Sequence, residues 1–289
     1  MAESPAHKFG QIIGELLESV IRTPLEQFCQ KQGLYLDHQK KERHARRGRK
    51  VSWEDPYGNF HDLDFVIERG GNNNEIGQPV AFIEVAWRRY TKHSRNKVQE
   101  IQGAILPLAE KYKWNNPFLG TVLAGIFTTT SIDQLRSLGF QTLYFPYETI
   151  IAAFATEDID IKFDESTPDE DFRKCAEKIE KASDEVIQRI KDALIETNSH
   201  QVNQFFSALN ARLGRFIRRI IVIPLYGRSN EFPSVSEALK FLDVHAIYEG
   251  SGDFRKYEIF VEFSNGDKVD ASLSSKQQVR DFLSFINTQ

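Results

Sequence analysis

Two acidic residues stand inside segments that otherwise have the composition of buried β-strands. Asp64 precedes the apolar run FVI, and Glu84 interrupts the run AFIEVAW. A carboxylate in an apolar strand is costly unless a cation or hydrogen bonds satisfy it. Two such carboxylates on adjacent strands would form an oxygen-rich site that suits Mg²⁺. The alternative is a structural role for Glu84, in which it pairs with Arg88 or Arg89.

The elements that would position these acids are predicted from residues 61–103. The pattern there indicates a strand, a turn built on GGNNN, a second strand, a basic connector and a helix that begins near Lys97. Because side chains alternate along a strand, Phe82, Glu84 and Ala86 are expected on one face of the second strand. The two acids therefore belong to neighbouring elements.

A third acid, Glu18, lies in a helix predicted over residues 9–28. Gly10, Gly14 and Glu18 are spaced by four, so they share one side of that helix. We expect the glycines to allow close approach to a sheet, which would place Glu18 beside it. The alternative for Glu18 is a solvated position on the helix flank. Pro24 is expected to kink or divide this helix.

Two local segments carry an excess of positive charge in a chain whose formal net charge is −4. Residues 40–50 hold seven Lys or Arg side chains and one acid, and residues 87–97 interleave two aromatic residues with basic ones. Phosphate and base contact would use these mixtures. The alternatives are a solvated loop and a solvated connector whose aromatic side chains pack on the core. The residues expected to contact DNA are Lys40, Lys41, Arg46, Arg47, Arg49, Arg88, Arg89, Lys92 and Arg95.

Composition sets the broad class. The chain has 289 residues, of which 40% are hydrophobic, enough for one large domain or two smaller ones. Cys29 and Cys175 fit no metal-ligand spacing and sit in helical patterns, where cysteine usually serves as a small apolar residue. No apolar run reaches the length of a membrane span, and we see no signal peptide. These features favour the reducing cytoplasm.

The order of predicted elements is that of an α/β protein in three parts. Residues 1–155 are predicted to form a compact core with a mixed central sheet flanked by helices. Residues 156–204 are predicted to form an acidic linker followed by a long amphipathic helix over 172–193, and residues 205–289 a small α+β module. That module shows a capping box at Ser234 and Glu237 and a hairpin turn signal, SNGD.

The helix acid Glu18, the strand-opening Asp64 and Glu84 within AFIEVAW resemble, in order and spacing, the PD-(D/E)xK nuclease superfamily. That superfamily includes type II restriction endonucleases and Holliday-junction resolvases. The resemblance covers residues 9 to about 150 and implies a restriction endonuclease-like core. Leu63 replaces the proline before the first acid. Ala86 replaces the lysine expected two positions after Glu84, and the candidates to supply that lysine are Lys97 and Lys92.

The resemblance implies a Mg²⁺-dependent endonuclease that cuts double-stranded DNA. Asp64, Glu84 and the main-chain carbonyl of Val85 would hold the metal, with Lys97 adding positive charge and Glu18 matching the family's helix acid. A restriction-type role in bacterial defence and a homodimer are the corresponding expectations.

Two other interpretations stay open. In the first, the chain is a non-catalytic DNA-binding subunit on the same fold, with Ala86 marking a lost active site. In the second, it is an α/β interaction protein whose basic loop binds an acidic partner.

Overall fold

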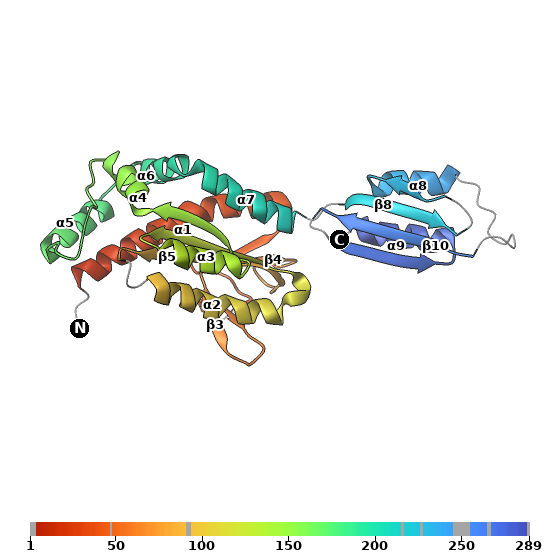
Figure 1. The fold of residues 1–289 in the computed structure, drawn as a ribbon, viewed down its shortest axis with the longest axis horizontal. Coiled ribbons are helices and arrows are strands. Elements are labelled where there is room, and N and C mark those ends of the chain that lie inside the picture. The colour runs from red at the N-terminus through yellow and green to blue at the C-terminus, as the bar shows by residue number, and fades with distance from the viewer. Residues whose placement is uncertain are drawn as a thin grey trace. The chain divides into compact units, whose positions relative to one another are not determined.

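The computed structural model describes residues 4–46, 48–90, 94–214, 217–225, 228–244, 255–264 and 267–287. The chain divides into two compact units, residues 1–209 and residues 210–289. Figure 1 shows both units as ribbons, with some of their elements labelled.

The first unit is built on a five-stranded mixed sheet. The strand order is β1-β4-β5-β6-β7, in which the pairs β1–β4 and β4–β5 are antiparallel and the pairs β5–β6 and β6–β7 are parallel. Its strands are β1 (Tyr35–His38), β4 (Phe65–Arg69), β5 (Gln78–Arg88), β6 (Phe118–Gly125) and β7 (Gln141–Pro146). The α/β class expected from the sequence is therefore present. A separate hairpin, β2 (Val51–Glu54) and β3 (Phe60–Leu63), lies between β1 and β4 in the chain.

Helices cover both faces of this sheet (Figure 1). One face packs against α2 (Ser94–Lys111) and α3 (Thr129–Ser137), because Val98, Ile101 and Leu135 join Phe82 and Ala86 of β5 in one buried cluster. The other face contacts α1 (Pro5–Gln32) and α4 (Tyr147–Ala155). A short 3₁₀ helix, η2 (Lys113–Asn115), leads into β6.

Two helix predictions need correction. Of the two effects expected of Pro24, a kink or a division, the division does not occur, because α1 runs unbroken for 28 residues with Pro24 inside it; the kink stays a prediction. The single long helix expected over residues 172–193 is instead α5 (Asp169–Glu180) and α6 (Asp184–Thr197), and α7 (Ser199–Leu213) follows. The break occurs because Ser183 adopts an extended conformation and its side chain accepts a hydrogen bond from the Val186 amide, which starts a new helix.

In the second unit the described residues form a four-stranded antiparallel sheet, in the order β11-β10-β8-β9, and two helices. Its elements are β8 (Ile217–Pro224), β9 (Asn230–Phe232), α8 (Val235–Val244), β10 (Tyr257–Phe263), β11 (Lys268–Leu273) and α9 (Lys276–Asn287). Alternate residues such as Ile259 and Val261 pack with Leu242 and Leu283 from the helices into a core of its own. Asn265 and Gly266 of the SNGD turn signal lie outside the described residues.

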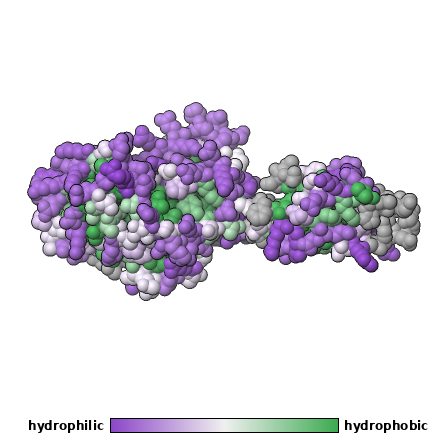
Figure 2. Space-filling view, turned by 90° about the horizontal axis from the view of Figure 1, so that it is seen from above, coloured by the Kyte–Doolittle hydropathy of each residue, from purple (hydrophilic) through white to green (hydrophobic). Residues whose placement is uncertain are grey.

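The surface of the first unit and the state of the two cysteines can be compared with what the composition predicts. In the view of Figure 2 the first unit is mostly hydrophilic, and its hydrophobic residues surface in separate patches. Cys29 and Cys175 are both buried and free. Among the described residues, no helix is long and apolar enough to cross a membrane.

Candidate functional site

The two strand acids are neighbours across the antiparallel pair β4–β5. Phe65, the first residue of β4, pairs with Ile83 of β5, and Asp64 and Glu84 adjoin this pair on the two chain segments. Repulsion from Asp64 raises the pKa of Glu84, which places the two carboxylates close together. The structure therefore brings Asp64 and Glu84 side by side, where β4 begins.

Main-chain hydrogen bonds fix both carboxylates. The amide of Val85 donates to Asp64 Oδ2 at 2.7 Å, and the amide of Asp64 donates to the carboxylate of Glu84. Glu84 is only 8% exposed. The backbone of Val85 consequently lies next to the pair, where its carbonyl could supply a third oxygen.

Burial makes this pair hard to ionise. Burial raises the pKa of Asp64, and the Val85 amide and Lys97 only partly oppose that rise. Burial and repulsion from Asp64 raise the pKa of Glu84 to about 8, against a smaller opposing effect of Lys97. Two acids that face one another with insufficient compensating charge are the condition in which carboxyl pKa values rise.

Lys97 supplies positive charge to the carboxylate pair. It lies in the first turn of α2. Attraction to its ammonium group lowers the pKa of both Asp64 and Glu84. Its Nζ also lies 3.5 Å from Glu100 Oε2, and its side chain is 21% exposed. The position where the resembled motif has lysine is filled by Ala86, which is buried in the hydrophobic cluster beneath α2.

Glu18 belongs to the same electrostatic group. Burial, together with repulsion from Asp64, raises the pKa of Glu18 to about 7. Gln39 Nε2 donates a hydrogen bond of 3.4 Å to Glu18 Oε2. The helix acid predicted from the sequence is thus brought within electrostatic reach of Asp64 and is not a fully solvated side chain.

An open groove of about 570 Å³ runs beside the acids. Its walls come from the first half of α1, the end of β5 and the start of α2. Val85 and Lys97, which contact or face the carboxylate pair, both line it. Besides Lys97, the residues that line the groove with polar or charged groups are His7, Gln11, Arg88, Arg89, Tyr90, Asn96 and Glu100.

The glycines of α1 have a different role from the one expected. A Cβ atom built at Gly10 or Gly14 would meet nothing within 4 Å, so neither glycine is needed for close packing on the sheet. Both residues line the groove instead. Their missing side chains leave that side of α1 open, and this correction assigns them to the cavity wall.

The residues present suit a cation held by few protein ligands. Within the described part of the chain, no group of three or more His, Cys, Asp or Glu side chains is arranged to hold a metal ion. Mg²⁺ usually keeps several waters and takes one or two carboxylates plus substrate phosphates. Asp64 and Glu84, with the Val85 carbonyl, fit that kind of donor set because they bring oxygen atoms together beside the groove, with the Val85 amide bonded to Asp64.

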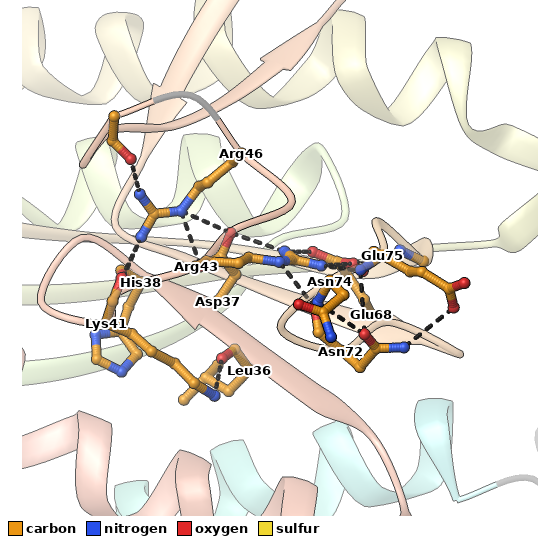
Figure 3. A network of polar contacts seen from close by, with 12 residues as sticks. Leu36, Asp37, His38, Lys41, Arg43, Arg46, Glu68, Asn72, Asn74 and Glu75 are labelled. Atoms are coloured by element: carbon orange, nitrogen blue, oxygen red, sulfur yellow. Dashed lines mark hydrogen bonds and ion pairs between the residues drawn. The ribbon is translucent and has the colours of Figure 1, made fainter.

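Two arginines of the basic loop 40–50, Arg43 and Arg46, are directed inward. The Arg43 side chain is fully buried, and its guanidinium bonds Asp37 Oδ2 at 2.9 Å and both oxygens of Glu68 at 2.5 and 2.8 Å (Figure 3). The main-chain oxygens of Asn72 and Glu75 take its two remaining bonds. All five N–H donors of the guanidinium are therefore used.

Arg46, one of the expected DNA contacts, belongs to the same network. Its side chain is 8% exposed, and Nε lies 3.2 Å from both carboxylate oxygens of Asp37. Its other nitrogens donate to main-chain oxygens of His38, Lys41 and Gly48 (Figure 3). Arg46 is occupied by these partners, which leaves it little capacity to bind phosphate. The sequence showed the charge run but not the distant acids that neutralise it.

The remaining basic residues of the loop differ from one another. Lys40 pairs with Glu15 at 3.2 Å. Lys41 donates to the Leu36 carbonyl and lies over the Tyr35 ring. Arg49 is exposed, and Arg47 lies outside the described residues.

Both described ends of the basic connector, residues 87–90 and 96–97, contribute to the wall of the groove. Arg88 and Arg89 both line it, and Arg88 Nη2 is 4.0 Å from Glu100 Oε2. The alternative pairing of Glu84 with these arginines is not among the ion pairs formed by the described residues. Arg95 is exposed on the first turn of α2, whereas Lys92 lies outside the described residues.

Comparison of the chain with models of known protein families, with curated protein sequences and with solved structures finds no match.

Proposed function

We propose that the first unit is a Mg²⁺-dependent DNA endonuclease with a restriction endonuclease-like core, of the PD-(D/E)xK type, acting in bacterial defence. The observation that supports this most is the buried pair Asp64 and Glu84, held side by side with too little positive charge around it. Burying such a pair destabilises the fold, so its presence is best explained by a cation that the site takes up.

A bound Mg²⁺ would lower the pKa of a water molecule and neutralise charge on the scissile phosphate. Asp64, Glu84 and the Val85 carbonyl would hold that ion. Lys97 would place its ammonium near the phosphorus, where negative charge develops during hydrolysis. Glu18 has a pKa of about 7, so it can exchange a proton near neutral pH. It would orient the attacking water or accept a proton from it.

The groove would carry the DNA backbone past these residues. Arg88, Arg89 and Lys97 line it, and Arg95 is exposed at the start of the same helix that carries Lys97. Phosphate contacts of this kind set position and affinity but read no sequence. Base reading, or the contact between the two subunits of a homodimer, would then fall to the second unit.

The test is cleavage of plasmid and genomic DNA with Mg²⁺ or Mn²⁺. The native chain should cut, and Asp64→Ala or Glu84→Ala should abolish cleavage while metal-free DNA binding, measured by fluorescence anisotropy, survives. Glu110→Ala is a matched control, because Glu110 is an exposed acid on α2. Cutting by Glu84→Ala at the native rate would contradict the assignment.

Lys97 is tested separately. Lys97→Ala should slow cleavage while metal binding stays intact, because a charged lysine donates no lone pair to a metal ion. Lys97→Arg should retain more activity than Lys97→Ala, and Lys113→Ala is an exposed lysine control. Normal cutting by Lys97→Ala combined with loss of cutting in Lys92→Ala would reassign the missing lysine without changing the mechanism.

One observation favours a second function, a non-catalytic DNA-binding subunit. Ala86 is packed into the hydrophobic cluster at the position where the resembled motif has lysine. If the native chain cuts no DNA with either metal and Glu84→Ala changes nothing measurable, this binding function replaces the nuclease.

A further inference from the structure

A second cavity, of about 700 Å³, shares two wall residues with the groove. Arg89 and Tyr90 line both spaces. The other walls of this cavity are Ile126 after β6, residues Tyr147, Glu148 and Ile151 of α4, and the segment from Lys162 to Glu165. A ligand that occupies the groove could therefore extend past Arg89 into the cavity.

Hydrogen bonds hold the hydroxyl groups of the two tyrosines that line this cavity. Tyr147 Oη donates to the Ile161 carbonyl at 2.5 Å and accepts from the Phe163 amide at 3.1 Å. Tyr90 Oη donates to the Asp164 carbonyl at 3.1 Å. Phe163 packs against Phe172 with ring centroids 4.7 Å apart. The rings are thus held in place before any ligand arrives.

Arg89 stands at the junction of the two spaces with unused donor capacity. Its guanidinium carbon lies 4.2 Å from the ring centre of Phe172 and 4.6 Å from that of Tyr90. Its Nε is buried and has no hydrogen-bond partner within the described part of the chain. A guanidinium held between aromatic rings in this way is ready to receive an anion such as a phosphate.

We propose that this cavity receives one unpaired nucleobase of the DNA strand that follows the groove, with Arg89 binding the phosphate at the junction. The proposal rests on the proposed nucleic-acid function of the groove. Aromatic side chains stack on bases of any sequence. Tyr90 and Phe163 are the partly exposed aromatic residues here, and Ile126 and Ile151 add apolar wall surface beside them. Lys162 and Glu148 at the wall supply a donor and an acceptor for the edge of the base.

The experiment compares two DNA duplexes in EDTA, so that no cleavage is required. One duplex is fully paired, and the other has the same sequence with a single unpaired thymine. Native protein should bind the bulged duplex at least about fivefold more tightly, because one base gains an aromatic stacking contact. Equal affinity for the two duplexes would overturn the proposal.

A cavity-filling variant localises the effect. Ile151→Trp places an indole in the cavity and should bring the affinity ratio close to one, while affinity for the paired duplex stays at the native level. Ala152→Trp is the matched control, because it adds the same side chain at the next, exposed position of α4. Retention of the full bulge preference by Ile151→Trp would overturn the proposal.

A second measurement needs no variant and so does not depend on the folding of Ile151→Trp. A 5-iodouracil at the unpaired position should photocrosslink to a peptide that contains Tyr90 or Phe163, identified by mass spectrometry. A crosslink elsewhere in the chain would overturn the proposal. Absence of the bulge preference with plasmid cleavage intact removes the cavity proposal alone, whereas absence of any DNA binding removes both proposals.

Discussion

Two of the sites at which the described residues bury charge treat it in opposite ways. In the network around Arg43, two arginines and the two acids Asp37 and Glu68 balance one another, and hydrogen bonds satisfy them (Figure 3). At the pair Asp64 and Glu84, burial and mutual repulsion raise the acid pKa values, and Lys97 compensates only in part. A balanced buried network is typical of a structural element, whereas an unbalanced one is the arrangement on which we base the proposed cation site.

The network around Arg43 also explains why the sequence of loop 40–50 predicts more exposed positive charge than the structure shows. Seven positive residues in eleven suggest an exposed surface, yet Arg43 and Arg46 are neutralised by acids on β1 and β4. Despite burial, which lowers it, hydrogen bonds to Glu68 and Asp37 raise the pKa of Arg43 above its ordinary value. Its positive charge is therefore permanent and internal.

The largest stability effect is expected from Arg43. Arg43→Ala would leave Glu68 and Asp37 buried with reduced compensation, which should lower the free energy of unfolding by about 3–5 kcal/mol. Arg49→Ala, which changes an exposed arginine of the same loop, should alter it by less than about 0.5 kcal/mol. Denaturant unfolding of both variants measures the difference, and equal effects would contradict a buried, charge-balanced network.

At the carboxylate pair, removing a charge should stabilise the metal-free protein, whereas removing Arg43 destabilises it. The folded-state pKa of Glu84 is about 8, above its ordinary value, so the folded chain binds more protons than the unfolded chain between about pH 4.5 and 8. Metal-free stability should therefore fall as pH rises through this window, and the raised pKa of Glu18 acts in the same direction.

Glu84→Gln tests this pH dependence. The amide cannot ionise, so at pH 8 the variant should be more stable than the native chain by roughly 2–4 kcal/mol, since each pKa unit corresponds to about 1.4 kcal/mol. Thermal unfolding from pH 5 to pH 9 measures the effect. Mg²⁺ should stabilise the native chain more at pH 8 than at pH 5 and should leave Glu84→Gln unchanged. A native stability that increases from pH 5 to pH 8 without metal would rule out the unbalanced pair.

The two charged sites differ in how far the sequence could predict them. Asp64 and Glu84 were predictable because Asp64 directly precedes one apolar strand and Glu84 interrupts the next, and the turn between the two strands makes antiparallel pairing the simplest arrangement. The partners of Arg43 were not, because Glu68 lies 25 residues away and has the pattern of a polar strand end. The cavity beside Tyr90 joins residues of α4 with segments that follow β5 and α4, and no local periodicity reports that meeting.

Salt dependence of DNA binding should separate the basic residues by their surroundings. Removing one phosphate contact should reduce the slope of log K against log salt by about one unit. Arg95→Ala and Arg88→Ala, on the exposed helix start and the groove wall, should each lower the slope. Arg46→Ala should leave the slope unchanged and reduce stability instead, because its guanidinium is held by Asp37. A lower slope in Arg46→Ala would return the loop to the DNA surface.

The smallest change in stability is expected at Gly10 in α1, and Gly77 in a turn provides the comparison. Gly10→Ala should stabilise the protein by about 0.5–1 kcal/mol, because alanine favours a helix interior and its Cβ meets nothing within 4 Å. Gly77→Ala should destabilise, because a Cβ there would lie 2.3 Å from the Gly71 amide nitrogen, in the turn that packs around Glu68. Denaturant midpoints of the two variants give the comparison.

A larger side chain at the first glycine separates stability from binding. Gly10→Phe keeps the helix but projects a ring into the groove, so it should weaken metal-free DNA binding without unfolding the protein. Gly103→Phe is the matched control, because a Cβ atom at Gly103 of α2 also meets nothing within 4 Å and this glycine does not line the groove. Anisotropy titrations should show weaker binding for Gly10→Phe alone. If both variants bind DNA like the native chain, the DNA does not follow α1, and the open glycine face would have to serve a different ligand from the one that the carboxylate pair and its lysine favour.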